Sequence, residues 1–256
     1  MARGAALITG ASSGIGAELA KLCTAAGYRA ILVARDIPAL EGVARGLTGP
    51  SRVLPADLSD PAAPEAIFEQ TRDEPVEILI NNAGFGLRGP FAETDWGAES
   101  RMIQVNLTAL AHLTKLYLPE MRRRGAGRIL NVASTAAFAP GPFMSVYYAT
   151  KAFVVSFSHA IANEMQGSGV TVTVLCPGPT ITSFQDRAGI AGSKLFRGPA
   201  MSAADVAREG FQAMMEGRVE IIAGARNRRL ILGTRLAPRT LLAKLTRRLN
   251  RDAASS

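Results

Sequence analysis

The stretch that decides the fold reads Ala5-Ala6-Leu7-Ile8-Thr9-Gly10-Ala11-Ser12-Ser13-Gly14-Ile15-Gly16. It begins with an apolar run typical of a short buried strand and continues into a glycine-rich loop. Residues 15–22 then have helical character up to Gly27, and a second apolar run follows at residues 30–34. This order of strand, loop, helix and strand is the unit that binds a dinucleotide at the N-terminus of its helix.

The glycines of this loop suit a phosphate ligand. They let the backbone turn tightly and approach a pyrophosphate, whose charge the helix dipole and the first N–H groups of the helix then stabilise. A glycine-rich turn without a ligand is the alternative, and the flanking strands argue against it. The predicted cofactor contacts in the loop are Gly10, Ser12, Ser13, Gly14, Ile15 and Gly16.

The end of the second strand bears on the choice of cofactor. An NAD site places an acidic side chain there, whereas an NADP site lacks the acid and has an arginine nearby. Arg35 follows Ala34 directly, which favours NADP(H) over NAD(H). Asp36 would repel a 2′-phosphate if it pointed the same way, and an ordinary solvated Arg35 is the alternative interpretation.

Two further strand ends carry candidate cofactor contacts. Residues 53–58 are expected to form the third strand and to end near the adenine, and residues 78–80 run into an Asn-Asn-Ala-Gly turn. Small residues and amides at a strand end suit close approach to a ribose, although structural bracing is equally open for the asparagines. The predicted contacts are Asp57, Leu58, Asn81, Ala83 and Gly84.

A Tyr-x-x-x-Lys spacing marks the candidate catalytic residues. Tyr147 and Lys151 lie four positions apart, so on a helix they share one face. A tyrosine has an ordinary pKa of about 10, and a cation a few ångströms away lowers that pKa. Ser134 ends an expected strand at residues 128–134, and its hydroxyl would hold a carbonyl or alcohol oxygen while the tyrosine moves the proton.

Six separated motifs together resemble the short-chain dehydrogenase/reductase family. The resemblance covers residues 5 to about 215 and agrees in both order and spacing. It implies an α/β fold, a Rossmann-like doubly wound parallel sheet with helices on both faces. The motifs are Thr9 to Gly16, Asn81-Asn82-Ala83-Gly84, Asn106, Ser134, Tyr147-x-x-x-Lys151 and Pro177-Gly178.

The resemblance also implies a role for each catalytic residue. The tyrosine donates the proton during reduction, the lysine lowers its pKa and holds the nicotinamide ribose, the serine positions the substrate oxygen, and the asparagine anchors a water. This tetrad falls on Asn106, Ser134, Tyr147 and Lys151. By the same resemblance, the loop containing Pro177, Gly178, Thr180 and Thr182 lies at the nicotinamide carboxamide.

Three loops near these motifs are rich in apolar residues and predict an apolar substrate. They cover residues 85–87, 138–144 and about 183–201. The third also contains glycines, which predict a mobile lid, and basic residues that would meet an acidic group. We expect a hydrophobic ketone, aldehyde or alcohol, although these apolar side chains would alternatively pack on the domain itself.

The chain of 256 residues suits one large domain. We expect residues 1–216 to form the NAD(P)-binding catalytic domain and residues 217–256 to form a basic extension. The extension holds ten basic and two acidic side chains and accounts for the whole net charge of +8. Neither cysteine lies in a metal-binding pattern. Without an apolar run long enough for a membrane span or a signal-peptide pattern, the protein is expected in the cytoplasm, at most peripheral at a membrane.

The end of the extension predicts a basic amphipathic helix. At helical spacing its leucines, Leu241, Leu242, Leu245 and Leu249, share one face. Three interpretations compete for residues 235–251, namely a membrane surface, a protein surface and nucleic acid. The segment lacks an aromatic residue for base stacking, so we expect no nucleic-acid partner. Docking on protein is favoured over anionic lipid.

The sequence therefore predicts an NADP(H)-dependent oxidoreductase that interconverts a carbonyl and an alcohol on an apolar small molecule. The family resemblance also suggests a homodimer or homotetramer built on residues 99–124 and 147–166. A non-catalytic NADP(H) sensor is the alternative, and the intact tetrad argues against it.

Overall fold

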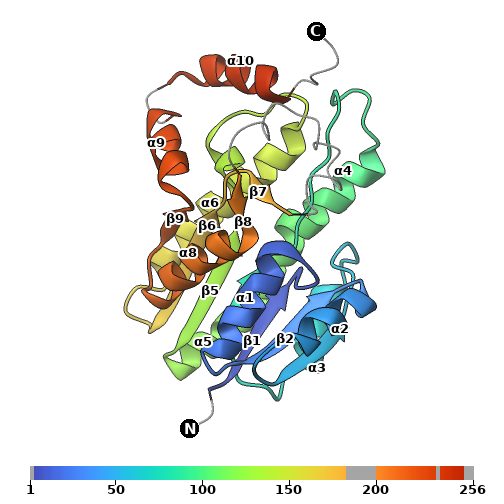
Figure 1. The fold of residues 1–256 in the computed structure, drawn as a ribbon, viewed down its shortest axis with the longest axis vertical. Coiled ribbons are helices and arrows are strands. Elements are labelled where there is room, and N and C mark those ends of the chain that lie inside the picture. Colours follow the sequence, from blue (N-terminus) through green and yellow to red (C-terminus); the bar gives the residue numbers. More distant parts are fainter. Residues whose placement is uncertain (1–2, 183–199, 235–236, 251–256) are drawn as a thin grey trace.

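In the computed structural model, residues 3–182, 200–234 and 237–250 are described. Within them the core is a seven-stranded sheet in the order β3-β2-β1-β4-β5-β6-β9, and every neighbouring pair is parallel. The predicted doubly wound α/β fold is confirmed (Figure 1). The strands are β1 (Ala5–Thr9), β2 (Arg29–Ala34), β3 (Ser51–Pro55), β4 (Val76–Asn81), β5 (Gly127–Val132), β6 (Val170–Cys176) and β9 (Glu220–Ile222).

The central strands are apolar along their length because both faces of the sheet are covered. Leu7 and Ile8 of β1, which point to opposite faces, are both fully buried. The strand order reverses between β1 and β4, and in open α/β sheets ligands bind beyond the carboxyl ends of the strands at such a point.

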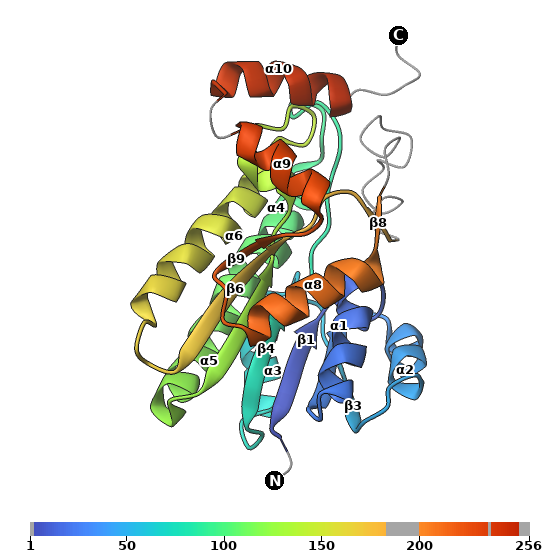
Figure 2. The ribbon, with the colours of Figure 1, turned by 60° about the vertical axis from the view of Figure 1, so that its left-hand side comes forward.

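Helices pack on the two faces in separate groups. The core on one face joins the sheet to α1 (Gly14–Ala25), α2 (Ile37–Arg45) and α8 (Ala203–Met215). The core on the other face joins it to α3 (Ala63–Gln70), α5 (Leu110–Arg124) and α6 (Ser145–Glu164). Figure 2 shows α1 and α8 side by side on the first face.

One helical stretch departs from regular geometry. The helix α4 (Trp96–Ile103) passes through a π-helical turn, η1 (Gln104–Ala109), into α5. The π-helical turns found inside helices frequently mark functional positions, and η1 contains Asn106, one of the predicted catalytic residues.

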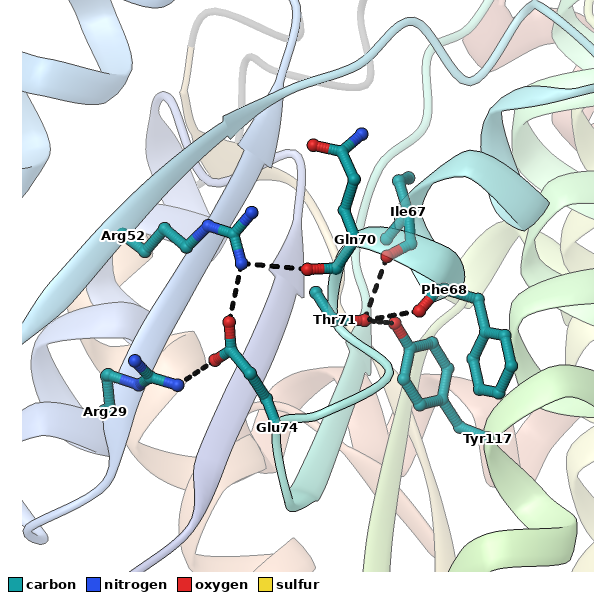
Figure 3. A network of polar contacts seen from close by, with 8 residues as sticks. All are labelled: Arg29, Arg52, Ile67, Phe68, Gln70, Thr71, Glu74 and Tyr117. Carbon is teal, nitrogen blue, oxygen red and sulfur yellow. Dashed lines mark hydrogen bonds and ion pairs between the residues drawn. The ribbon is translucent and has the colours of Figure 1, made fainter.

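A polar network ties the amino-end side of the sheet together (Figure 3). The carboxylate of Glu74 forms ion pairs with Arg29 of β2 and Arg52 of β3. At the end of α3, the Thr71 hydroxyl is 2.5 Å from the Tyr117 hydroxyl of α5. Because the network lies at the end opposite the carboxyl ends of the strands, we assign it a structural role.

The sheet extends past the boundary predicted at residue 216. β9 pairs with β6 from Glu220 to Ile222, so the residues of the predicted extension supply the seventh strand. The sequence does not reveal this strand, because three residues are too few to show a periodicity, so the predicted boundary at residue 216 falls before the end of the sheet. Two short strands, β7 (Thr180–Ile181) and β8 (Met201–Ser202), form a second small sheet.

The last described elements are two helices above the carboxyl ends of the strands, α9 (Ala225–Thr234) and α10 (Arg239–Asn250) (Figures 1 and 2). No described helix is long and apolar enough to cross a membrane. The predicted lid at residues 183–201 lies almost wholly outside the described residues, and so do its basic residues.

Candidate active site

A cleft of about 960 Å³ lies beyond the carboxyl ends of the central strands. It runs from Arg35 at the end of β2 to Leu249 of α10. Most of the side chains and loops predicted from the sequence meet there. The predicted residues that line it are Gly10, Ser12, Ser13, Gly14, Ile15, Arg35, Asp57, Leu58, Ala83, Gly84, Ser134, Tyr147, Lys151, Pro177, Gly178, Thr180 and Thr182.

The glycine loop needs its glycines for conformation and for space. Gly10 has a φ of +64° and Gly14 a φ of +57°, in the left-handed region that side chains disfavour. A Cβ on Gly16 would lie 2.3 Å from the Gly10 carbonyl oxygen. Gly16 is not among the residues that line the cleft, so its part is to let α1 pack closely against the loop.

Asn82 and Thr9 hold this loop in place, and neither was among the predicted contacts. The Asn82 Nδ2 donates to the carbonyl oxygens of Thr9 and Gly10, over 2.9 and 3.1 Å. In return, the Thr9 Oγ1 accepts from the backbone N–H groups of Asn82 and Ala83, each over 3.0 Å. The Asn-Asn-Ala-Gly motif predicted that an asparagine lies near the glycine loop, but it did not predict that Asn82, rather than Asn81, would contact the loop.

Asn81, by contrast, is not brought to the cleft. It is buried, and its Nδ2 donates to the Asn131 Oδ1 over 2.9 Å and to the Thr114 Oγ1 over 3.1 Å. These bonds join β4 to β5 and α5. Structural bracing, the alternative given for the asparagines, is therefore what the structure supports for Asn81.

The residues present fit a dinucleotide. Helix α1 begins at Gly14 beside the loop and carries no acidic residue in its first turn, so its positive end is open to phosphate charge. After β4, the absence of a side chain at Gly84 leaves room beside Asn106 and Lys151. A Cβ at this position would lie 3.0 Å from the Asn106 Oδ1 and 3.4 Å from the Lys151 Nζ.

Three charged residues, Arg35, Asp36 and Asp57, lie at one end of the cleft and make two separate interactions. Arg35 lies 3.7 Å from the Asp57 carboxylate, and both side chains are substantially exposed. Burial opposes ionisation of Asp57, but hydrogen bonds from Ser59 and the charge of Arg35 outweigh it and lower the Asp57 pKa. Asp36 caps α2, accepting from the backbone N–H of Ala39 over 3.0 Å.

The catalytic candidates converge from two elements. Tyr147 and Lys151 lie one turn apart on α6, and Ser134 lines the same cleft, where its side chain acts to lower the pKa of Tyr147. Ser134 follows β5 and caps the 3₁₀ helix η2 (Thr135–Phe138), its Oγ accepting from the Ala136 N–H over 3.1 Å. Its orientation is thus fixed by the backbone.

The prediction that Lys151 lowers the pKa of Tyr147 is not met. Burial raises the pKa of Tyr147, and the hydrogen bond from Ser134 offsets only part of that rise. The Lys151 Nζ lies 5.9 Å from the centre of the Tyr147 ring and donates to the Val132 carbonyl oxygen over 2.9 Å. Burial also lowers the pKa of Lys151, to about 8.

Asn106 is buried and does not line the cleft. Its Nδ2 donates to the Phe85 carbonyl oxygen over 2.9 Å and to the Thr150 Oγ1 over 3.2 Å. Its Oδ1 accepts from the Phe85 N–H over 3.0 Å. In this structure Asn106 therefore joins three segments around the site, namely η1, the loop after β4 and α6.

The last helix closes the end of the cleft beyond Tyr147, which the sequence did not predict. Asn250 donates through Nδ2 to the Pro142 carbonyl oxygen over 2.9 Å and accepts at Oδ1 from the Tyr148 hydroxyl over 3.3 Å. The Thr246 Oγ1 donates to the Pro140 carbonyl oxygen. Of the three interpretations of the tail, docking on its own domain is the one these bonds support.

A doubly wound sheet with a glycine loop that suits a dinucleotide, with a serine just after β5 and with a tyrosine and a lysine on α6, defines an oxidoreductase that acts on carbonyl or alcohol groups. Residues 4–190 match the family model described as short chain dehydrogenase. The chain belongs to the short-chain dehydrogenase/reductase family, as its motifs predicted.

Individual relatives agree with this membership. The chain is 34% identical over 177 residues to "Ketoacyl reductase HetN" of Nostoc sp., a match that spans 67% of this chain and 62% of that protein. A solved short-chain dehydrogenase from Sphingobium yanoikuyae in complex with NADPH has a TM-score of 0.81 and 32% identity, covering 91% of this chain and 94% of the other.

A second solved structure covers the whole chain. It is the bulky-bulky ketone specific alcohol dehydrogenase from Comamonas testosteroni, with a TM-score of 0.77 and 26% identity over 100% of this chain and 98% of that one.

Proposed function

We propose that the protein is an NADP(H)-dependent enzyme that interconverts a carbonyl and an alcohol on an apolar small molecule. The observation that carries the proposal is that Ser134, Tyr147 and Lys151 line one cleft together with the glycine loop. When bound, the dinucleotide supplies or accepts the hydride.

In the direction of reduction, the Ser134 hydroxyl holds the carbonyl oxygen and the Tyr147 hydroxyl donates a proton to it. Burial raises the pKa of Tyr147, so its hydroxyl carries the proton at neutral pH, and the same rise makes it a weaker proton donor than an ordinary tyrosine. Lys151 faces the same pocket from one turn along α6 and is the residue we assign to the nicotinamide ribose.

The proposal of NADP(H) rather than NAD(H) rests on Arg35. Its side chain lines the cleft and is 71% exposed, so it is accessible to a 2′-phosphate. Asp36 also lines the cleft beside Arg35, and its carboxylate accepts from the Ala39 N–H of α2, so its negative charge stays near the predicted 2′-phosphate position. The Sphingobium relative was solved with NADPH.

The first experiment follows NADPH consumption with a panel of apolar ketones and aldehydes. Tyr147→Phe removes one oxygen and is expected to reduce kcat by at least about 100-fold, while NADPH binding measured by calorimetry persists. Tyr28→Phe is the matched control, since Tyr28 is buried before β2 and does not line the cleft. Tight NADPH binding without turnover of any substrate would favour a cofactor sensor instead.

A second experiment tests cofactor choice. Arg35→Ala is expected to raise the KM for NADPH by about 10- to 100-fold, the value of one or two charge-assisted hydrogen bonds, and to leave the KM for NADH little changed. Arg45→Ala, an exposed arginine on α2 outside the cleft, is the control. An equal effect on both cofactors would contradict the assignment.

We also propose that the enzyme works in the cytoplasm as a homodimer or homotetramer, through the faces of α4, α5 and α6. The support for this proposal is the membership of the short-chain dehydrogenase/reductase family. Sedimentation equilibrium tests this directly, and a monomeric mass at micromolar concentration would contradict it.

A further inference from the structure

The cleft continues well past the catalytic tyrosine. Beyond Tyr147 it is lined by Met144 and Tyr148, and then by residues of the two C-terminal helices. Those residues are Leu230, Ile231 and Thr234 of α9, and Leu242, Leu245, Thr246 and Leu249 of α10. The cleft therefore reaches from the predicted cofactor loop past Tyr147 to the two C-terminal helices.

Among the described residues, this far wall is apolar and partly exposed. Leu230, Leu245 and Leu249 line the cleft, yet 65, 46 and 42% of their surfaces are exposed. Such apolar surface at a binding cleft is available for burial by a ligand.

The threonines of the wall do not make it polar. The Thr234 Oγ1 donates to the Ile231 carbonyl oxygen over 2.7 Å. The Thr246 hydroxyl donates its one proton to the Pro140 carbonyl oxygen over 2.5 Å, and the Leu242 carbonyl oxygen, 2.9 Å away, is a second acceptor within reach. Because both hydroxyls have backbone acceptors, a ligand that offers no hydrogen bonds leaves neither of them without a partner.

The wall is held in a defined position. Asn250 is 1% exposed, and besides its bonds to Pro142 and Tyr148 its carbonyl oxygen accepts from the Arg88 Nε over 2.9 Å. The Arg247 guanidinium lies 5.3 Å from the centre of the Phe143 ring. A helix fixed at this many points can act as a wall of the site.

We propose that α9 and α10 form the distal wall of the substrate site, and that the substrate carries an extended unbranched or lightly branched apolar chain lying against Leu230, Leu245 and Leu249. Asn250 is a positioning residue that holds this wall against the catalytic helix through Tyr148. The inference rests on the proposed function for the reacting carbonyl, and it adds the class of substrate.

The test is the dependence of kcat/KM on chain length for straight-chain methyl ketones from butan-2-one to undecan-2-one, with saturating NADPH. Each methylene buried against the wall is expected to raise kcat/KM about three- to fourfold. In the double variant Leu245→Ala, Leu249→Ala, we expect each added methylene of the longer ketones to raise kcat/KM by less than half of the three- to fourfold factor expected for wild type. Alanine is a strong helix former, so α10 is retained.

Leu241→Ala is the matched control. Leu241 lies on the same helix and is 48% exposed, close to the value for Leu245, but it does not line the cleft. The control is expected to keep the wild-type dependence on chain length. Asn250→Ala is expected to flatten that dependence as the double variant does, whereas a purely structural role would lower the melting temperature without changing the ratio of long to short ketones.

The outcomes separate this inference from the proposed function. Turnover of the ketones with no dependence on chain length, or an equal effect of Leu241→Ala and the double variant, would overturn the inference and leave the reductase intact. If no ketone turns over, the distal wall is tested by measuring, by calorimetry, the binding of the same ketones to the NADPH-bound protein. Affinity that rises with chain length in wild type but not in the double variant supports the wall, and a flat series refutes it.

Discussion

Asn106 of the π-helical turn donates a hydrogen bond through Nδ2 to the Thr150 Oγ1 of α6 over 3.2 Å. Thr150 directly precedes Lys151, so the bond connects the irregular turn between α4 and α5 to the catalytic helix. The same amide also bonds both backbone groups of Phe85 at the end of the β4 loop. One buried side chain thus holds three segments of the site in register.

Asn106→Ala is expected to destabilise the protein as well as reduce its activity. It leaves the N–H and carbonyl of Phe85 without these partners in a buried setting, so the free energy of unfolding should fall by about 1–3 kcal/mol. Urea denaturation measures this. Asn163→Ala, on an exposed position near the end of α6, should stay within about 0.5 kcal/mol of wild type, and equal losses in the two variants would contradict the bracing role.

Lys151 should make stability depend on pH in a defined window. Burial lowers its folded pKa to about 8 from 10.5, so between these values the unfolded chain binds more protons and the free energy of unfolding rises with pH. Below pH 8 the lysine is charged in both states, and its burial cost is fully present.

Lys151→Met removes this dependence. The difference in unfolding free energy between wild type and variant should therefore change in favour of wild type as the pH rises from 8 towards 10. Using the difference cancels the cysteines and tyrosines that titrate nearby. A difference that stays constant across that range would show that Lys151 titrates normally.

If Tyr147 is the acid and base of the reaction, the rates of reduction and of oxidation should depend differently on pH. Because burial raises its pKa, the protonated acid needed for reduction is present throughout the neutral range. The phenolate needed for alcohol oxidation becomes available only as the pH rises. Oxidation should therefore accelerate from pH 7 to 10 while reduction changes little up to pH 9, and parallel profiles for the two directions would argue against Tyr147 as the shared acid and base.

Gly16→Ala should weaken dinucleotide binding although Gly16 does not line the cleft. The added Cβ would meet the Gly10 carbonyl at 2.3 Å, which forces the loop or α1 to shift. We expect at least a tenfold increase in the Kd for NADPH measured by fluorescence titration. Gly233→Ala in α9, where a Cβ meets nothing within 4 Å, should bind NADPH normally, since alanine suits a helix better than glycine does.

Some features of the fold and of the candidate site could be predicted because a few consecutive residues are enough to determine them. The strand–loop–helix pattern of residues 5–25 predicted β1 and α1, and spacing alone predicted that Tyr147 and Lys151 share a face of a helix. The alternation of side chains along β4 did not separate Asn81 from Asn82 in the same way, because their directions depend on where the strand ends. That end is set by pairing with β5.

The sequence by itself determined the fold class and the glycine loop, and it placed the candidate catalytic side chains, since these depend on local periodicity and motif spacing. The tertiary structure alone decided that β9 completes the sheet, that α10 closes the cleft through Asn250, and that burial raises rather than lowers the pKa of Tyr147. Each of these three features depends on contacts between residues that are far apart in the chain. The desolvation that such contacts cause cannot be predicted from a short segment of sequence.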